Sequence, residues 1–371
     1  MRLVFWTSVA FVAYTYAGYP IWVYLRSRWG RRPIRAQEIF LPVSIVMSVH
    51  NEEKSLPRKL RNLGELDYPS DLYEIIVVSD GSTDATNQIL TSSASRRLRV
   101  FILPNQEGKA SALNKGIQEA RGRIVVLTDS RQRIEAKALR HLLANFADPS
   151  VGCVSGELML GDPNSTAGAQ GLGFYWKLEK LIREWESASG SVVGATGALY
   201  AARRELLTTL PKGTLLDDVY LPMHVVRGGK RVIFDPQART WDRLATPRCE
   251  YRRKVRTLTG NYQLLHHAPW LLTFANPLLF RFVSHKLMRL LAPFALLAVL
   301  VSSMFLQGIL YQSVFLLQVV FYSLPALLLL KGQLRLAGKL GEASLAFLLL
   351  NTAATVAFFY FLTGKKHVWV R

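Results

Sequence analysis

Residues 74–90 read "EIIVVSDGSTDATNQIL", an apolar run that ends on Asp80 and is followed by a polar turn and a candidate helix. The apolar run has the length and composition of a strand that is buried on both faces. The small polar residues after Asp80 are typical of a helix start, and we expect Ser82 or Thr83 to cap that helix. A strand followed at once by a helix is the repeating unit of a sheet with parallel strands.

The same unit recurs on both sides of this stretch. The pattern predicts further strands at residues 43–49, 98–103 and 123–129, and helices at residues 55–63, 110–120 and 135–146. This alternation predicts an α/β domain with a doubly wound, mostly parallel sheet. Ligands of such sheets bind beyond the carboxyl ends of the strands. The polar residues of the sequence fall at these ends: His50, Asn51, Glu52, Asp80 and Asp129.

Long apolar stretches flank the predicted domain. The chain has 371 residues, half of them hydrophobic, and stretches without any charge occupy residues 3–25, 290–310, 311–330 and 343–363. Each has about the 20 residues that an α-helix needs to cross a hydrocarbon core of roughly 30 Å. We therefore expect about four transmembrane helices, the first at residues 1–25. Tyr24 and Leu25 end the first stretch where a signal peptide would have small residues, which favours an anchor over a cleaved signal.

The formal net charge is +20, from 46 Lys and Arg against 26 Asp and Glu. The basic clusters lie beside the apolar stretches, at residues 26–35, 252–256 and 331–339. Positive residues favour the cytoplasmic side, so we expect an integral plasma (cell inner) membrane protein whose soluble part faces the cytoplasm. The expected units are a basic linker at 26–40, a soluble domain at 41–249, an amphipathic interfacial segment at 250–286 and a membrane region at 287–371. No RNA-binding signature is present, and we expect no nucleic-acid partner.

Two acidic strand ends and a glycine-lysine loop suggest a ligand site. Residues 105–116, "NQEGKASALNKG", place Gly108 and Lys109 before a helix start, which suits an anionic group. Asp80 and Asp129 end two strands of the same predicted sheet. Each has an alternative interpretation as a turn or helix-cap residue. Their convergence on one edge of the sheet favours a ligand site.

A second candidate site lies at residues 213–223, "GTLLDDVYLPM". Asp217 and Asp218 are adjacent and lie between apolar residues, where unpaired carboxylates are costly to bury. Paired acids raise one another's pKa, which suits a general base. The alternative is a pair of capping residues on a helix. Upstream, Gly194, Thr196 and Gly197 form a glycine-rich turn at which an acceptor has room to approach the backbone.

These motifs together resemble the membrane-embedded family-2 glycosyltransferases, which are inverting enzymes of GT-A fold. That group includes cellulose, chitin and hyaluronan synthases and ceramide glucosyltransferase. The resemblance covers residues 43–261, in the family's order, and rests on seven motifs: "VSIVMSVHNEE", "EIIVVSDGSTDAT", "NQEGKASALNKG", "VLTDS", "GATGALYAARR", "LLDDVYLPM" and "RRKVRTLTGN".

The resemblance implies a role for each candidate residue. His50, Asn51 and Glu52 would lie at a nucleotide-sugar site, where Asp80 would contact the base or ribose and Lys109 would lie near the nucleotide. Asp129 would hold Mg²⁺ or Mn²⁺ on the diphosphate, and Arg256 would contact that diphosphate. Asp218, with Asp217 beside it, would be the base that deprotonates the acceptor. Gly194, Thr196, Gly197 and Arg253 would form the acceptor region.

Three residues depart from the family's pattern. Arg131 stands where many sugar-nucleotide enzymes have a second carboxylate, but Mg²⁺ needs only one or two carboxylates when phosphates complete its shell. We expect Arg131 to pair with phosphate; the alternatives are that it turns away into solvent or partly replaces the metal. Arg253 and Thr257 replace a glutamine and a tryptophan, and that tryptophan supports the acceptor sugar in processive synthases. We therefore expect transfer, from a UDP-linked donor, to a lipid or short glycan. A processive polysaccharide synthase and an inactive membrane partner of a synthase are the alternatives.

Overall fold

The computed structural model describes residues 1–161, 174–244, 246–330 and 335–364. An eight-stranded mixed sheet forms the centre of its soluble part, in the order β3-β2-β1-β4-β7-β6-β8-β5. The strands are β1 (Val43–Val49), β2 (Tyr73–Asp80), β3 (Leu98–Leu103), β4 (Ile124–Thr128), β5 (Arg133–Ile134), β6 (Val151–Leu160), β7 (Leu199–Arg203) and β8 (Arg231–Asp242). Strands β1 to β4 are parallel, and β7 runs antiparallel to β4 and β6. The predicted α/β fold with a mostly parallel sheet is confirmed.

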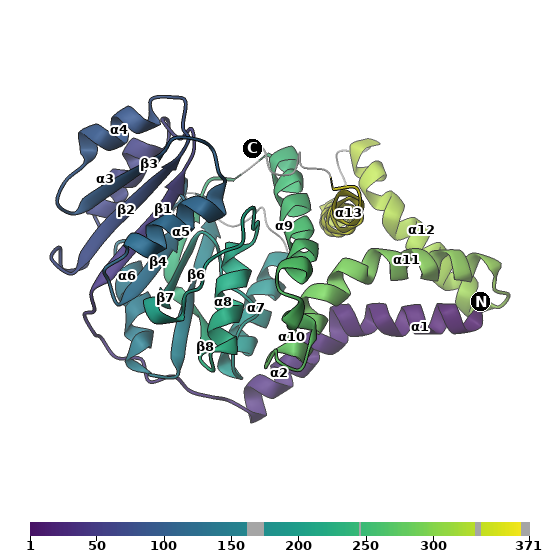
Figure 1. Ribbon diagram of the computed structural model, residues 1–371. Helices are drawn as coiled ribbons and strands as arrows, with labels where there is room; N and C mark the ends of the chain where they lie inside the picture. Colours follow the sequence, from purple (N-terminus) through teal and green to yellow (C-terminus); the bar gives the residue numbers. More distant parts are fainter. Residues whose placement is uncertain (162–173, 245, 331–334, 365–371) are drawn as a thin grey trace.

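Helices cover both faces of this sheet (Figure 1). They are α3 (Leu56–Gly64), α4 (Thr86–Ser93), α5 (Lys109–Glu119), α6 (Ala138–Ala144), α7 (Phe174–Ala188) and α8 (Asp217–Arg227), with 3-10 turns at Asn145–Ala147 and Arg204–Leu206. Successive side chains of a strand point to opposite faces. Val46 accordingly packs with α5 and α8, whereas Ile45 and Met47 pack with α3, α4 and α6. The central strands β1, β2 and β4 are largely apolar because both of their faces are buried.

Two predicted helix starts were wrong. Ser82 and Thr83 do not cap α4, which begins at Thr86. They bond instead to Asn51, because the loop after β2 is held against the loop after β1. The helix expected at 135–146 begins at Ala138, because residues 133–134 pair with β8 as the short strand β5.

The C-terminal region contains the predicted membrane helices. Three segments are long and apolar enough to cross a membrane: Leu279–Phe305, Ile309–Ala326 and Ala343–Leu362. They belong to α10 (Leu279–Phe282), η5 (Val283–Leu287), α11 (Met288–Phe305), α12 (Ile309–Leu330) and α13 (Arg335–Leu362). The first begins earlier than the predicted stretch at residue 290, and this extension contains Arg281, His285, Lys286 and Arg289.

The N-terminal segment differs from the expectation of a first span. It is helical throughout, as α1 (Arg2–Ala13), η1 (Tyr14–Gly18) and α2 (Tyr19–Trp29), and α1 packs along α11 (Figure 1). Among the described helices, however, it is not one of those apolar enough to cross a membrane. Its tyrosine, tryptophan, serine and threonine residues make it more polar than the three C-terminal segments.

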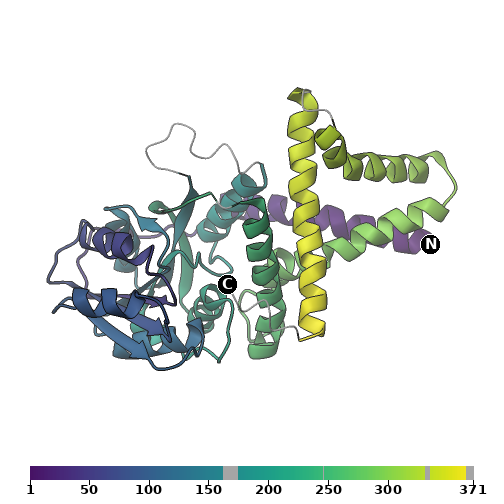
Figure 2. The same ribbon diagram turned by 90° about the horizontal axis from the view of Figure 1, so that it is seen from above.

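The predicted interfacial segment lies between the soluble domain and the membrane helices. It forms α9 (Pro247–His267) and a 3-10 turn at Pro269–Leu272 before α10. Figure 2 shows α13 crossing α11 and running beside α9. The contact between α9 and α13 includes Tyr262, whose ring stacks on Phe361 with 5.6 Å between centroids. Helix α9 is therefore held between the sheet domain and an apolar helix.

Candidate active site

Asp80 joins the end of β2 to the loop before α5. Its carboxylate accepts hydrogen bonds from the backbone N–H groups of Glu107 at 2.7 Å and Gly108 at 2.9 Å. The next residue, Gly81, has a φ of 60°, and a Cβ there would lie 2.4 Å from the backbone nitrogen of Gln106. Only glycine allows the two loops to approach this closely. The structure thus brings together the two segments that the sequence assigned to one anionic site.

The residues that follow β1 brace the same region. His50 Nδ1 lies 2.7 Å from the backbone oxygen of Asp80, and Asn51 Oδ1 accepts from Thr83 N at 2.8 Å. Glu52 is buried, and its N–H donates to Thr86 Oγ1 at 2.8 Å. These three residues hold the loops after β1 and β2 together. Their contact with a nucleotide stays a prediction.

Lys109 connects two of the predicted acids. Its Nζ lies 3.0 Å from Asp129 Oδ1 and 3.0 Å from Asp217 Oδ1. Burial lowers the pKa of Lys109, but the two carboxylates outweigh burial and raise that pKa above its ordinary value. The lysine is therefore a cation, and it links the end of β4 to the start of α8. Tyr200 donates to the other oxygen of Asp217 at 3.1 Å.

Asp218 lies against the predicted acceptor turn. Its Oδ2 accepts from Gly197 N at 3.0 Å, and its backbone oxygen accepts from Ala195 N at 2.6 Å. A Cβ on Gly197 would lie 3.0 Å from that carboxylate oxygen, and Gly194 has a φ of 95°. Burial and the charge of Asp217 raise the pKa of Asp218 to about 6, against the opposing charges of Lys109 and Lys286. A carboxylate with this pKa is suited to accept a proton near neutral pH.

Arg183 of α7 supports the acceptor turn, and the sequence analysis missed it. Its guanidinium donates to Thr196 Oγ1 at 2.6 Å and to Ser155 Oγ at 2.7 Å. Ser155 in turn accepts from Thr196 N at 2.9 Å. The signal in the sequence was an arginine next to the apolar Ile182 in a stretch with the pattern of an amphipathic helix. In the structure Ile182 is fully buried.

Lys59 of α3 is a second residue that was missed. It is buried, and its Nζ donates to Thr128 Oγ1 at 3.0 Å and to the backbone oxygen of Gln132 at 2.8 Å. These acceptors flank Asp129, so the lysine fixes both ends of the loop that carries it. Burial lowers the pKa of Lys59 to about 7, although Asp129 opposes this shift. A lysine on the same helix face as Leu56 and Leu63 was the available signal.

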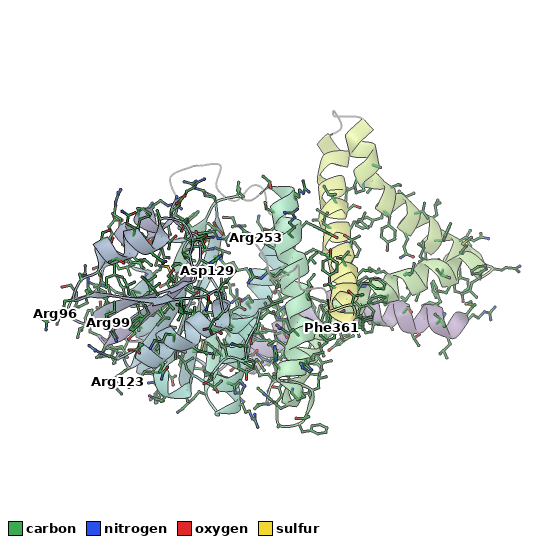
Figure 3. The ribbon with its side chains drawn as sticks, turned by 45° about the horizontal axis from the view of Figure 1, so that its top comes forward. Arg96, Arg99, Arg123, Asp129, Arg253 and Phe361 are labelled. Atoms are coloured by element: carbon green, nitrogen blue, oxygen red, sulfur yellow. The ribbon has the colours of Figure 1, made fainter. Side chains whose placement is uncertain are left out.

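Arg253 lies beside the Asp129 loop (Figure 3). Its guanidinium is 3.6 Å from Asp242 Oδ2, and that oxygen accepts from Gln132 Nε2 at 3.0 Å. In the same loop, the backbone oxygen of Arg131 accepts from Arg58 at 3.2 Å. The Nε of Arg131 is buried and has no hydrogen-bond partner among the described residues. Arg58 of α3 and Arg253 of α9 therefore both lie beside the loop that carries Asp129.

Helix α9 presents Arg256 on the face that packs against the approach to Asp217. Gln263 Oε1 accepts from Leu215 N at 3.0 Å, and its Nε2 donates to Gly213 O at 2.9 Å. A Cβ on Gly260 would lie 2.6 Å from Leu216 Cγ. Residues 256, 260 and 263 share one face of a helix. Arg256 thus lies one turn before the point where α9 touches the chain that leads into α8.

The comparisons with known proteins agree with this geometry. The sequence model described as Glycosyl transferase family 2 matches residues 44–210. Residues 44–210 are a family 2 glycosyltransferase domain. The matched range contains Asp80, Lys109, Asp129 and the turn at residues 194–197 that contacts Asp218. Asp218 itself and α9 follow this range in the sequence.

Three curated proteins are similar in sequence to this chain over about 60% of its length. Identity is 28% to probable glycosyltransferase YdaM of Bacillus subtilis (59% of this chain, 55% of that protein). It is 24% to beta-monoglucosyldiacylglycerol synthase of Nostoc sp. (65% and 53%) and 23% to poly-beta-1,6-N-acetyl-D-glucosamine synthase of Staphylococcus aureus (60% and 55%). The chain spans about half the length of these relatives.

A solved structure supports the fold of the whole chain. The mannosyltransferase PcManGT from Pyrobaculum calidifontis, in complex with GDP-Man and Mn²⁺, matches with a TM-score of 0.71 and 21% identity. The match covers 98% of this chain and 100% of that one. The expected GT-A fold, with membrane helices after the glycosyltransferase domain, is confirmed.

The residues of the glycosyltransferase domain fit a divalent cation that the donor helps to bind. Among the described residues, no three His, Cys, Asp or Glu side chains are placed to hold a metal by themselves. Asp129 offers one carboxylate, and the Lys109 ammonium lies between Asp129 and Asp217, where both carboxylates stabilise positive charge. Mg²⁺ is commonly bound by one or two carboxylates with water and substrate phosphates. Asp129 is therefore the residue that would hold Mg²⁺ or Mn²⁺.

Proposed function

We propose that this chain is an inverting glycosyltransferase that moves a sugar from a nucleoside diphosphate sugar to a membrane-associated acceptor. One observation carries the proposal: a continuous ion-paired chain, Asp129–Lys109–Asp217, ends beside Asp218. In this proposal Asp129 binds the diphosphate and Asp218 is the general base, so the two roles lie on opposite sides of one lysine. A displacement reaction needs a stabilised leaving group and an activated acceptor in this arrangement.

On the donor side, Asp80 and the loop before α5 receive the nucleoside, and UDP is the expected nucleotide. Asp129 holds the divalent cation, which when bound offsets the negative charge that develops on the diphosphate. Lys109, Arg131 and Arg256 supply further positive charge to the same phosphates. The buried Nε of Arg131, without a partner among the described residues, supports this role because a phosphate oxygen would satisfy it.

On the acceptor side, Asp218 takes the proton from the attacking hydroxyl. The acceptor oxygen bonds to the anomeric carbon while the bond from that carbon to the diphosphate breaks, and the nucleoside diphosphate leaves. A single displacement of this kind inverts the anomeric configuration. The Gly197 N–H holds Asp218 in place, and the turn of Gly194, Thr196 and Gly197, with Arg253, borders the acceptor.

The acceptor is a lipid or a short glycan at the plasma membrane, with the glycosyltransferase domain on the cytoplasmic side. The basic segment at residues 26–35 supports this orientation. Similarity to a beta-monoglucosyldiacylglycerol synthase favours a lipid, and similarity to a poly-beta-1,6-N-acetyl-D-glucosamine synthase favours the alternative of a processive polysaccharide synthase. The size of the labelled product separates these two functions.

The test uses purified full-length protein with native lipids and a panel of radiolabelled UDP- and GDP-sugars. We expect one donor to be transferred in the presence of Mg²⁺ or Mn²⁺. Asp218→Asn should lose transfer by about 10²–10⁴-fold, the usual contribution of a general base. Its donor affinity, measured by isothermal titration, should stay near that of the unmodified protein. Wild-type protein that neither transfers nor hydrolyses any donor would favour an inactive partner of a synthase.

A further inference from the structure

A cavity of about 250 Å³ lies between the ends of α2 and α7, away from the acids described above. It is lined by Ser27, Arg28 and Arg31 from the N-terminal segment and by Trp185 and Ala188 from α7. The backbone around it is fixed, because Arg32 N donates to Ala188 O at 2.8 Å. The cavity is therefore built by two elements that are bonded to each other.

The cavity is strongly basic. Residues 26–35 contain five arginines with exposed side chains: Arg26, Arg28, Arg31, Arg32 and Arg35. In the described parts of the chain, neither Arg28 nor Arg31 forms an ion pair with a carboxylate. Arg28 lies over the ring of Tyr24, which itself contacts Trp185 edge-on at 5.1 Å. The charge of the two lining arginines is thus available to a ligand.

The helix ends that meet here do not cancel this charge. Helices α2 and α7 both end at the cavity, and C-terminal carbonyls would repel an anion. In α7 these carbonyls already accept hydrogen bonds from two further arginines: Arg281 bonds Glu186 O at 2.7 Å, and Arg231 bonds Ser187 O at 3.0 Å. Burial lowers the pKa of Arg231, and the charges of Arg32 and Arg281 lower it further against the effect of Asp148. Positive charge is therefore in local excess.

The packing of the N-terminal helix along the first C-terminal span puts the cavity just beyond the start of that span. Helix α1 runs antiparallel to α11: Phe5 contacts Tyr311 beyond the far end of α11, and Trp22 contacts Phe280 at 4.6 Å, at the start of the span Leu279–Phe305. Arg28 is six residues past Trp22, which is about 9 Å along a helix. The headgroup layer on each side of the hydrocarbon core is roughly 5–8 Å thick, so Arg28 lies at its outer edge, from which a long arginine side chain reaches the headgroups.

A tryptophan at the same level supports this depth. Trp29 is 82% exposed at the end of α2, next to Arg28. Tryptophan side chains concentrate at membrane interfaces, where their rings lie among the headgroups. In a fully aqueous position this large exposed ring would have no partner.

We propose that this cavity binds the phosphate of an anionic phospholipid headgroup, with Arg28 and Arg31 as its ligands and Trp185 as its wall. Guanidinium groups match phosphate oxygens in a bidentate geometry. A zwitterionic headgroup would bring its own ammonium group into this basic site, so an anionic lipid binds better. The bound lipid holds the end of α7 at the membrane surface.

The test measures lipid retention by the full-length protein in detergent micelles that contain phosphatidylglycerol or phosphatidylcholine, by native mass spectrometry. We expect preferential retention of phosphatidylglycerol. Each basic residue near a membrane surface contributes roughly fivefold to affinity, so Arg28→Gln with Arg31→Gln should bind about 30-fold more weakly. Arg28→Lys with Arg31→Lys keeps the charge and should retain most of the binding.

The matched control is Arg96→Gln with Arg123→Gln. Both side chains are exposed, and Figure 3 shows them at the end of the domain away from the membrane helices. This variant has the same change in net charge and should keep its lipid. Equal retention of the two lipids, unchanged binding by the glutamine pair, or equal loss by the lysine pair would each overturn the proposal. Full displacement of the lipid by millimolar glycerol 3-phosphate would assign the cavity to a soluble phosphate instead.

Discussion

The pKa of Asp218 links its environment to its chemistry. Burial and the neighbouring charge of Asp217 disfavour its ionised form, and Lys109 favours it. The folded-state pKa is raised, so the protonated carboxyl stabilises the fold at low pH, and this contribution is lost as pH rises through about 6. The ionised Asp218 carboxylate therefore destabilises the folded protein at neutral pH. Asp218→Asn should therefore raise the Tm at pH 7.5 while it removes activity.

The pH dependence of transfer follows from the same balance. Only ionised Asp218 accepts a proton, so kcat/KM should fall as pH drops below about 6. Asp217→Asn removes a charge that raises the pKa of Asp218, and the acid limb of its residual activity should move to lower pH. The measurement is a pH–rate profile from pH 4.5 to 8 for both proteins. An acid limb at the same pH in both would assign the titration to another group.

Lys59 should affect metal and donor binding through the Asp129 loop. Lys59→Met leaves the Gln132 carbonyl without this donor, and a buried group left unsatisfied costs about 1–3 kcal/mol, whereas Thr128 Oγ1 keeps its bond to the Ala198 carbonyl. We expect a several-fold higher Mn²⁺ concentration for half-maximal activity and weaker donor binding by titration. The control is Lys54→Met, whose side chain is exposed and lies before the start of α3. Unaltered Mn²⁺ dependence in Lys59→Met would show that the loop keeps its shape without the lysine.

The candidate site was partly predictable because strand ends are local features. Asp80, Asp129 and Asp218 were recognisable from the apolar runs and motifs around them. Lys59 and its partner Gln132 are 73 residues apart, and Arg183 and Ser155 are 28 apart. Such pairs form only after the sheet brings the segments together. The sequence shows that a charged residue such as Lys59 or Arg183 lies among apolar residues, but it does not show which distant residue accepts its hydrogen bonds.

At the scale of elements, α9 supports the segment that carries the two proposed catalytic acids, Asp217 and Asp218. Gly260 lies where α9 touches Leu215 and Leu216, immediately before Asp217. The Cβ added by Gly260→Ala would lie 2.6 Å from Leu216 Cγ, and the neighbouring chain must move to accept it. In a helix without such a contact, the same change stabilises by about 1 kcal/mol. Whether Gly260→Ala lowers or raises the stability therefore tests whether this contact exists.

We expect Gly260→Ala to lower both Tm and the rate of transfer, because overpacking costs about 1–3 kcal/mol and shifts Asp217. Gly64→Ala is the matched control: Gly64 ends α3, and nothing lies within 4 Å of its added Cβ. That variant should be equally stable or more stable, with full activity. Thermal unfolding and radiolabelled transfer, measured on both variants, make the comparison. A stabilised and fully active Gly260→Ala protein would show that α9 does not press on this segment.

Hydrophobic patterning predicted the presence of the helices and strands more accurately than it predicted their ends. Strands β1, β2 and β4 were predictable because both of their faces are buried and most of their residues are apolar, and β3 because only Arg99 interrupts its apolar run. The start of α4 was not, because Ser82 and Thr83 bond across to Asn51 instead of capping the helix. Strand β5 has two residues and exists only by pairing with β8. A pairing between distant segments leaves no local pattern.

At the scale of the whole molecule, the N-terminal helix joins the parts together. Its tyrosines lower its hydropathy, and the structure gives each of three a distant partner. Tyr14 bonds Ser284 of η5 at 2.8 Å, Tyr16 donates to Asn351 of α13 at 3.2 Å, and Tyr19 donates to Glu186 of α7. The π-helical turn η1 carries the first two of these tyrosines. A segment that the sequence suggested to be an anchor also links the membrane helices to the glycosyltransferase domain.

Glu186 is the centre of that link. It is fully buried; its Oε1 accepts from Tyr19 and lies 2.8 Å from His285 Nδ1, while its backbone oxygen accepts from Arg281 at 2.7 Å. Burial raises the pKa of Glu186, but His285, Tyr19 and Arg281 outweigh burial and lower it, so the carboxylate is ionised. One side chain thus connects α7 to α2 and to the start of the first C-terminal span. Loss of its charge leaves two buried partners unsatisfied at once.

Glu186→Ala should therefore destabilise the protein by about 3–5 kcal/mol, the usual cost of breaking a buried charged pair. In detergent this should lower Tm by more than about 6 °C for a domain of this size. Glu186→Gln keeps one acceptor oxygen and should lie between Ala and the unmodified protein. Glu65→Ala, at an exposed position beyond α3, is the control and should leave Tm unchanged. If Glu186→Ala unfolded at the same temperature as this control, α7 would be held by its apolar contacts alone. A graded loss from Gln to Ala would show that the membrane helices and the glycosyltransferase domain fold as one cooperative structure.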